Sequence, residues 1–267
     1  MTRLAMADNR KIDVQLNPDV VAEPAQMAAA ICREVVDLYF DALNKADLSK
    51  KPVPPDGETF FRFEQKGPDF NAEERRAAHE TWILARAFQD LMRGVRASLD
   101  EAYFFIQLLD TGRIRARTSS TLEEVLYPYR QAAARMNFPE VLSKVNARLD
   151  KPLEFAEAFQ SMQDTRNCLE HRGGMVGRVD AKTNGKMVLQ FPRLLMFVER
   201  EGERHEIHSG FSVMKGEWIM GSLELRKREY QIGQRFTLTA ADFEEIAFAC
   251  AHFAGELARN LPKRPQP

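Results

Sequence analysis

The stretch that decides the fold class runs from Asn71 to Gly112 and reads NAEERRAAHETWILARAFQDLMRGVRASLDEAYFFIQLLDTG. Its large apolar residues recur every three or four positions, the spacing of one face of an α-helix. Asn71 is a typical N-cap residue, the acids that follow favour the positive end of the helix dipole, and Gly112 marks the end. The sequence therefore predicts one long helix, or two that meet near residues 98–100. The predicted buried residues are Leu84, Phe88, Leu91, Val95, Leu99, Ala102, Ile106 and Leu109.

Helical patterns also lie on both sides of this stretch. After a polar N-terminal arm over residues 1–25, we expect further helices over residues 26–46, 121–136, 139–149, 151–171 and 240–261. The first of these is predicted to bury Ile31, Val35, Leu38 and Ala42. Prolines and a glycine between residues 52 and 57 exclude a helix there. The phenylalanines that follow are predicted to pack on the body of the protein, and they are Phe60, Phe61, Phe63 and Phe70.

The region after residue 175 differs in character, because it is rich in strand-forming residues and is divided by glycines. We expect strands over residues 186–191, 194–200, 218–220, 223–226 and 231–238. Thr239 then resembles an N-cap, and the last helix is predicted to bury Phe243, Ile246, Ala247, Cys250, Phe253, Leu257 and Leu261.

The sequence thus predicts a mainly α fold, in which a helical bundle has a small antiparallel β section inserted before the C-terminal helix. We expect a single domain over residues 26–262, with the β-rich section at about residues 186–238 and a tail over residues 263–267.

Composition narrows the class of protein. The 267 residues include 38 lysines and arginines and 39 acids, so the formal net charge is −1. This balance excludes a polycationic, nonspecific nucleic-acid binder but leaves room for a local basic site. No apolar run approaches the ~20 residues that span a bilayer, and the N-terminus lacks the apolar core of a secretory signal. Because the three cysteines are far apart, we expect a reducing compartment and a cytoplasmic protein.

The segment most relevant to chemistry is DTRNCLEHRGG, residues 164–174, at the end of a predicted helix. On an α-helix Asn167 and His171 differ by about 40° and share a face, whereas Arg166 and His171 differ by about 140°. The long arginine side chain can bend toward that face, so the three side chains could converge. Histidine can move a proton near neutral pH, and arginine can stabilise the charge on a pentacoordinate phosphorus. This set of residues suits phosphodiester cleavage without a metal ion.

At these residues the sequence resembles the HEPN family. The family signature is an arginine that is directly followed by a polar residue, often asparagine, with four to six residues between the arginine and a histidine; Arg166, Asn167 and His171 match it. HEPN domains are helical bundles that usually dimerise and bring two motifs into one cleft. Many are metal-independent endoribonucleases of toxin–antitoxin, phage-defence or CRISPR-associated systems. The resemblance implies attack by the ribose 2′-OH on the adjacent phosphate, with His171 as general acid or base, Arg166 stabilising the transition state and Asn167 supporting them.

The resemblance also implies RNA as the substrate, a homodimer, an antitoxin or other protein partner, and no metal ion or cofactor. Some HEPN-like proteins have lost catalysis, so a noncatalytic interaction or assembly module is the alternative, and a nucleotide-binding protein is a third hypothesis. A structural role for the motif stays open as well. In that case His171 would cap the helix carbonyls, and Arg166 would pair with Asp164 or Glu170.

Further basic residues complete the predicted site. As substrate-binding residues we expect two arginines that flank the motif and three that alternate after the long helix, where they could face an RNA backbone or lie in a solvated loop. They are Arg172, Arg178, Arg113, Arg115 and Arg117.

Other residues with reactive or aromatic side chains are interpreted as packing residues, namely Cys168, Trp82 and Trp218. His205 and His208 would point to opposite faces of a strand, which is a poor arrangement for a shared metal ion.

Overall fold

The computed structural model describes residues 16–50, 69–112, 119–208 and 210–263. The predictions for residues 1–15, for the phenylalanines between residues 60 and 63, and for Arg113, Arg115 and Arg117 lie outside these residues. In the described part of the chain, six helices and a three-stranded antiparallel sheet form the fold, and the sheet lies between the fifth and sixth helices in chain order. The predicted mainly α fold with a small β section before the last helix is confirmed.

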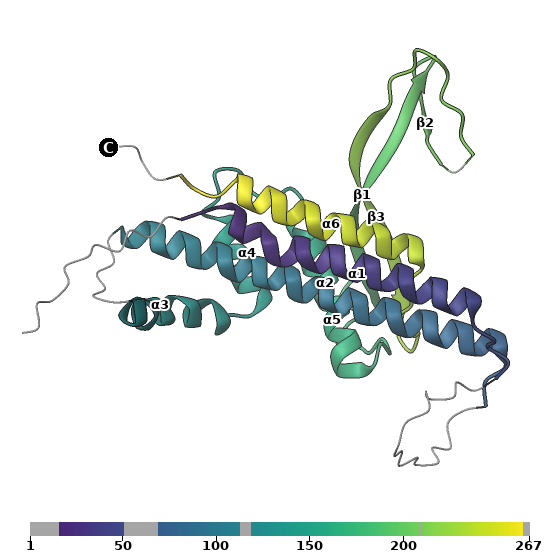
Figure 1. The fold of residues 1–267 in the computed structure, drawn as a ribbon, viewed down its shortest axis with the longest axis horizontal. Helices are drawn as coiled ribbons and strands as arrows, with labels where there is room; N and C mark the ends of the chain where they lie inside the picture. Colours follow the sequence, from purple (N-terminus) through teal and green to yellow (C-terminus); the bar gives the residue numbers. More distant parts are fainter. Residues whose placement is uncertain (1–15, 51–68, 113–118, 209, 264–267) are drawn as a thin grey trace, which may run out of the picture.

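Three long helices lie side by side along the molecule (Figure 1), namely α1 (Asp19–Lys45), α2 (Ala72–Thr111) and α6 (Ala240–Arg259). The Ala25 amide donates to Ser98 Oγ at 3.1 Å, and Arg76 donates to Asn44 at 3.0 Å. These two contacts show that α1 and α2 run antiparallel. Near Ser98 the helices are very close, because a Cβ atom added to Gly94 would lie 2.6 Å from the Cβ of Ala28.

Shorter helices cover another side of α2. They are α3 (Ser119–Ala134), α4 (Phe138–Asn146) and α5 (Ala156–Arg172), and each contacts α2. Arg96 of α2 fixes the connection between α3 and α4, since it donates to the carbonyls of Ala133 and Met136, both at 2.9 Å. One core cluster of buried residues joins all six helices and the near half of the sheet.

The sheet has the strand order β2–β1–β3. Most of β1 (Lys186–Arg200) pairs with β3 (Met220–Gln231), and its last residues pair with β2 (Glu203–Glu206). Glu201 and Gly202 both have positive φ and make the tight turn between β1 and β2. The near half of β1 packs on α5 and α6, whereas residues 194–208 and 210–225 project from the bundle (Figure 1). We call residues 194–208 and 210–225 the arm.

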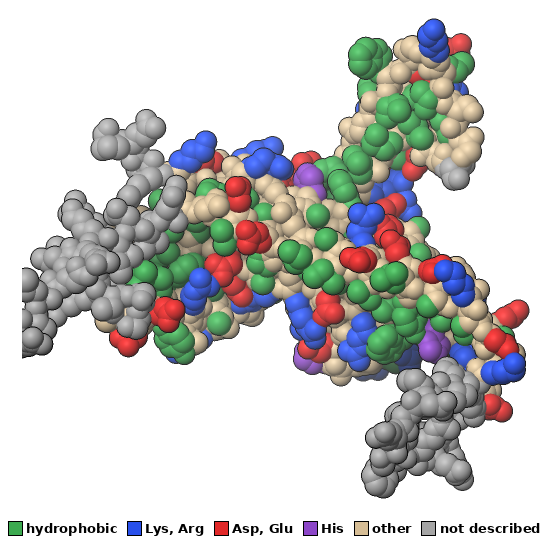
Figure 2. All heavy atoms as spheres, in the orientation of Figure 1, with side chains coloured by type: hydrophobic (Ala, Val, Ile, Leu, Met, Phe, Trp, Pro, Cys, Tyr) green, Lys and Arg blue, Asp and Glu red, His purple; other side chains and the backbone are tan. Residues whose placement is uncertain are grey.

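The arm carries exposed apolar side chains near its tip. Trp218 is 84% exposed, and Met214 and Ile219 are also more exposed than buried. Hydrophobic side chains are visible on the arm in Figure 2. The interpretation of Trp218 as a packing residue is therefore wrong. Arg200 holds the loop before β3 against β1, because it forms an ion pair with Glu217 at 2.6 Å.

Helix starts follow the predicted capping residues. Asn71 Oδ1 accepts from the Glu74 amide, and the Glu74 carboxylate accepts from the Asn71 amide, each at 3.0 Å. This reciprocal pair is a capping box. Thr239 caps α6 by accepting from the Asp242 amide at 3.0 Å.

Helix ends and buried faces also agree with the sequence. Gly112 and Gly173, both with positive φ, follow the last residues of α2 and α5. α2 continues through residues 98–100 without a break. The predicted buried residues of α2 and of the last helix are buried, apart from the half-buried Leu109. None of the described helices has the length and apolar character needed to cross a membrane.

The apolar face predicted for the first helix is wrong. Ile31, Val35 and Leu38 are 52%, 45% and 63% exposed. The helix begins at Asp19, so residues 19–25 belong to α1 and not to the polar N-terminal segment that the sequence predicts over residues 1–25. Small residues form much of its buried face and allow the close approach to Gly94, which leaves the larger apolar side chains outside. The buried residues of α1 are Val21, Ala22, Ala25, Ala29, Cys32, Val36 and Leu43.

Several predicted strand boundaries are wrong as well. Residues 186–200 form one strand through Pro192, which pairs with Leu225 of β3. β2 does not reach Pro192, so a residue without an amide hydrogen is tolerated there. β3 combines two predicted strands and ends at Gln231, so most of the strand predicted over residues 231–238 is absent, and β2 is not among the predicted strands.

Candidate functional site

The predicted motif lies on the second half of α5, which packs on the core through its buried face. Three contacts fix the end of this helix. The Gly174 amide donates to the Cys168 carbonyl at 3.2 Å, and Arg235, which follows β3, donates to the Gly173 carbonyl at 2.9 Å. The Phe236 amide also donates to the Gly174 carbonyl at 2.8 Å. The glycine pair therefore ties the end of α5 to the base of the sheet.

The structure brings Arg166 and Asn167 together. Arg166 forms an ion pair with Glu170 one turn further along α5, and its Nη1 lies 3.5 Å from Asn167 Oδ1. The same Asn167 oxygen accepts from Gln163 Nε2 at 2.9 Å. Asn167 thus contacts Gln163 and Arg166, and no hydrogen bond among the described residues joins it to His171. Asn167 is thus placed to position the arginine.

His171 lies apart from this pair. Its side chain is exposed on the last turn of α5, and no described residue forms a hydrogen bond or an ion pair with it. Asp164, the other acid considered as a partner for Arg166, forms an ion pair with Lys182 at 2.8 Å. The three motif side chains therefore do not converge within one chain, although Arg166 and Asn167 do.

The arginines that flank the motif differ in their surroundings. Arg172 forms a two-pronged ion pair with Asp180, from Nε to Oδ2 at 2.7 Å and from Nη2 to Oδ1. The buried Asp180 also accepts from the Gly177 amide at 2.9 Å, and its hydrogen bonds raise the pKa of Arg172. A phosphate would have to displace Asp180 to use the same donors, so this geometry favours a structural role for Arg172. Arg178 is exposed.

Two hollows lie between α2 and α5 and adjoin at Arg93, which lines both. The larger has a volume of about 780 Å³ and reaches Gly173 at the end of α5. The smaller has a volume of about 360 Å³ and contains Arg166 and Gln163. We call the two hollows together the α2–α5 groove.

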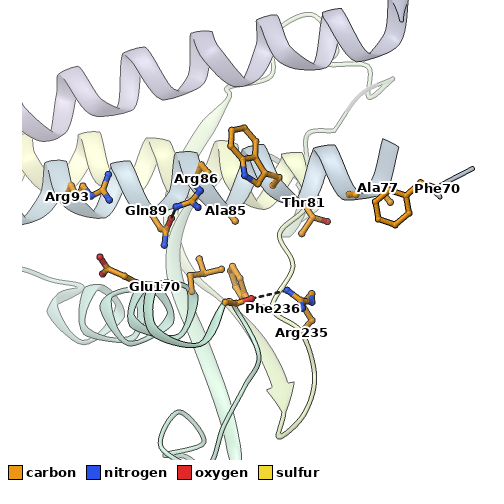
Figure 3. A pocket seen from close by; sticks show the side chains of 14 residues that line it. Phe70, Ala77, Thr81, Ala85, Arg86, Gln89, Arg93, Glu170, Arg235 and Phe236 are labelled. Atoms are coloured by element: carbon orange, nitrogen blue, oxygen red, sulfur yellow. Dashed lines mark hydrogen bonds between the residues drawn. The ribbon is translucent and has the colours of Figure 1, made fainter. Parts of the chain in front are cut away.

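Charged and polar side chains face one another across this groove (Figure 3). Arg86, Gln89 and Arg93 extend from α2, Glu170 extends toward them from α5, and Arg235 lies beyond the end of α5. Arg86 Nη1 donates to Gln89 at 3.1 Å, and Arg93 forms an ion pair with the exposed Asp90. The larger hollow is therefore lined by three arginines and one acid, Glu170.

No sequence pattern assigned Trp82, Arg86 and Arg93 to a site. Trp82 is 55% exposed at the larger hollow, so its interpretation as a core residue is wrong. The spacing of these residues in the sequence could nevertheless have indicated a shared surface. Trp82, Arg86, Gln89 and Arg93 are spaced by three or four residues, which places an aromatic and polar stripe on one side of a helix whose apolar stripe is elsewhere.

Cys168 is fully buried, as the packing interpretation expects, and burial raises the pKa of its thiol. Its sulfur lies 3.6 Å from the Met175 carbonyl, to which it donates. Among the described residues, no group of three or more histidines, cysteines and acids is arranged to hold a metal ion.

Comparisons with protein-family models, with curated proteins and with solved structures found no match for this chain. The resemblance to the HEPN family therefore rests on the motif of α5 and on its place in the helix.

Proposed function

We propose that this protein is a HEPN-like, metal-independent endoribonuclease that works as a homodimer in the cytoplasm, as a toxin or a phage-defence effector. One observation carries the proposal. The end of α5 presents a half-buried Arg166–Asn167 pair at a basic groove, and on its last turn an exposed histidine without an internal partner among the described residues.

The chemistry follows from these side chains. His171 removes the proton from the ribose 2′-OH or gives one to the leaving oxygen. The 2′ oxygen forms a bond to phosphorus, the bond from phosphorus to the 5′ oxygen breaks, and the products carry a 2′,3′-cyclic phosphate and a 5′-OH. Arg166 stabilises the charge that develops on the nonbridging oxygens. Since Arg166 is paired with Glu170, the phosphate competes with that carboxylate for the guanidinium.

A second copy of the chain completes this site. Within one chain, no hydrogen bond or ion pair among the described residues joins Arg166 to His171. A homodimer that faces two α5 helices toward each other would place an arginine of one copy beside a histidine of the other. An antitoxin or other protein partner would act by covering the same surface.

The test is RNA cleavage by the purified protein in the presence of EDTA, with the product ends identified by mass spectrometry. We expect 2′,3′-cyclic phosphate ends, a loss of about 10²–10⁴-fold in rate for His171→Ala, and a comparable loss for Arg166→Ala. His252→Ala is the matched control, because it removes a histidine on α6 outside the groove. If the wild-type protein cleaves no RNA between pH 6 and 8, or if His171→Ala cleaves as fast as the wild type, the proposal fails.

The alternative is a noncatalytic HEPN-like interaction or assembly module. The exposed apolar side chains at the tip of the arm favour it, because such side chains gather at protein interfaces. This function predicts a stable complex with a protein partner, which Trp218→Ser would weaken and His171→Ala would leave unchanged.

A further inference from the structure

The face of α2 that lines the α2–α5 groove runs over most of that helix. Lining residues recur every three or four positions from Ala77 to Asp100. With a rise of 1.5 Å per residue, this face is about 35 Å long. A single nucleotide would fill only part of it, so the shape suits an extended occupant.

The groove carries an excess of positive charge. Five arginines line it, Arg86, Arg93, Arg96, Arg166 and Arg235, against two acids, Asp100 and Glu170. Both acids already pair with arginines of the groove, Asp100 with Arg96 and Glu170 with Arg166.

Two of the remaining arginines have no carboxylate within ion-pair distance among the described residues. Arg86 donates to the Gln89 side chain, and Arg235 donates to the Gly173 carbonyl. Each guanidinium keeps further donors that point to no acid, so each can hold an anionic oxygen. Arg93 forms an ion pair with Asp90, but both side chains are exposed and such surface pairs are weak, so a phosphate can replace this carboxylate.

An aromatic surface accompanies these charges. Trp82 is 55% exposed and Phe70 is 37% exposed, and both line the larger hollow. Ala78 and Ala85 also line it, and on α1 the Tyr39 ring lies 6.4 Å from the indole of Trp82. Exposed aromatic rings next to arginines are the arrangement with which proteins hold single-stranded nucleic acids, since bases stack on the rings and phosphates contact the guanidinium groups.

We propose that the α2–α5 groove binds a segment of single-stranded RNA. One base stacks on Trp82, and Arg86, Arg93 and Arg235 contact the phosphates. The strand then reaches the smaller hollow, where Arg166 lies. This inference rests on the proposed function in its choice of RNA as the ligand, and it adds the residues that hold the strand.

Binding is measured with a short, fluorescein-labelled 2′-O-methyl RNA, which lacks the nucleophilic 2′-OH and so cannot be cleaved. We expect Trp82→Ala to bind about 5- to 150-fold more weakly, the range for loss of one base–aromatic stack. The logarithm of the binding constant falls linearly with the logarithm of the salt concentration, and three phosphate contacts on a single strand predict a slope near −2. Arg93→Ala removes one contact, so the slope should become less steep by about 0.7. Arg33→Ala, an arginine paired with Glu244 outside the groove, is the control for lost charge and should bind like the wild type.

A second readout is local to the groove. Trp82 and Trp218 are the only tryptophans, so Trp218→Phe leaves one indole, at Trp82. Its fluorescence should fall when the oligonucleotide binds. Without the oligonucleotide, its spectrum should be the same in every folded variant that keeps Trp82.

The outcomes separate this proposal from the proposed function. Binding that is lost in Trp82→Ala and Arg93→Ala but kept in His171→Ala supports the groove, even if no RNA is cleaved. If the protein cleaves RNA but both groove variants bind the oligonucleotide as tightly as the wild type, the proposed RNA-binding groove is wrong and the proposed ribonuclease activity is still supported. Quenching of Trp82 by adenosine monophosphate at the same affinity as by the oligonucleotide overturns the extended strand in favour of a nucleotide site.

Discussion

Replacing Gly94 with alanine should weaken the contact between α1 and α2, although alanine is the better helix former. A Cβ atom at position 94 would lie 2.6 Å from the Ala28 Cβ, 3.0 Å from the Pro24 carbonyl oxygen and 3.2 Å from the Ala25 Cα. Carbon atoms pack at about 3.5–4.0 Å, so α1 would have to retreat by about 1 Å. Two of these three neighbours are backbone atoms, which cannot rotate away as the end of a side chain can.

The magnitude follows from two opposing effects. Overpacking costs about 1–3 kcal/mol, and rigid neighbours place this site at the upper end of that range. The better helix propensity of alanine returns about 1 kcal/mol. We therefore expect Gly94→Ala to lower the free energy of unfolding by about 2 kcal/mol.

Urea denaturation followed by circular dichroism measures this loss, and α6 provides a matched control. A Cβ on Gly255 would come closest to the ends of two flexible side chains, at 3.3 Å from Arg259 and 4.0 Å from Gln26. Gly255→Ala should therefore be neutral or raise the free energy of unfolding by up to about 1 kcal/mol.

A double-mutant cycle with Ala28→Gly tests the contact itself. Ala28→Gly alone should cost about 1 kcal/mol through helix propensity. In the Gly94→Ala background it removes the closest neighbour, so the double variant should be more stable than the sum of the single losses predicts. Additive losses, or a Gly94→Ala protein as stable as Gly255→Ala, would refute the reasoning.

Three further predictions concern ionisable groups. Asp180→Ala removes the partner of Arg172 and should lower the free energy of unfolding, measured by urea denaturation, by about 2 kcal/mol. If the loss is no larger than the loss on replacing an exposed acid with alanine, the structural role of this pair is contradicted. The Arg200 guanidinium and the backbone amide of Met214 lower the pKa of Glu217 from 4.5 to about 2. The stability that this carboxylate provides is therefore present above pH 4.5 and lost as the pH falls through 2. A carboxyl NMR titration should show a midpoint of about 2, and Arg200→Gln should move it back toward 4.5. Burial raises the pKa of all three cysteine thiols, so none should react quickly with Ellman's reagent before denaturation. A thiol that reacts quickly in the folded protein would contradict this prediction. The thiols are those of Cys32, Cys168 and Cys250.

The parts of the fold that the sequence predicts are those set by local interactions. The cap of α2 depends on Asn71 and Glu74, three residues apart, and the end of α5 depends on a glycine with positive φ. The buried face of α1 could not be predicted in the same way. Two faces of that helix carry apolar residues, and the choice between them depends on the space above Gly94 in another helix.

The candidate site also has parts that local sequence patterns predict and parts that they do not. The position of Arg166, Asn167 and His171 at a helix end follows from the sequence, because all three lie on one helix that a glycine pair ends. The partner of Arg172 does not follow from helical spacing, since Asp180 lies beyond the turn. The α2–α5 groove could not be predicted either, because its two walls are about eighty residues apart in the chain and meet only in the folded protein.

β1 passes from the core to solvent along one continuous strand. Met187, Leu189 and Phe191 belong to the core cluster, whereas Leu194 and Met196 are exposed on the arm. Amide hydrogens near Leu189 should therefore exchange with solvent only when the whole protein unfolds, and those beyond Leu194 should exchange through fraying of the arm. A single strand then holds both well-protected and poorly protected amides of the sheet. Insertions and deletions at the tip of the arm can accumulate during evolution without disturbing the core.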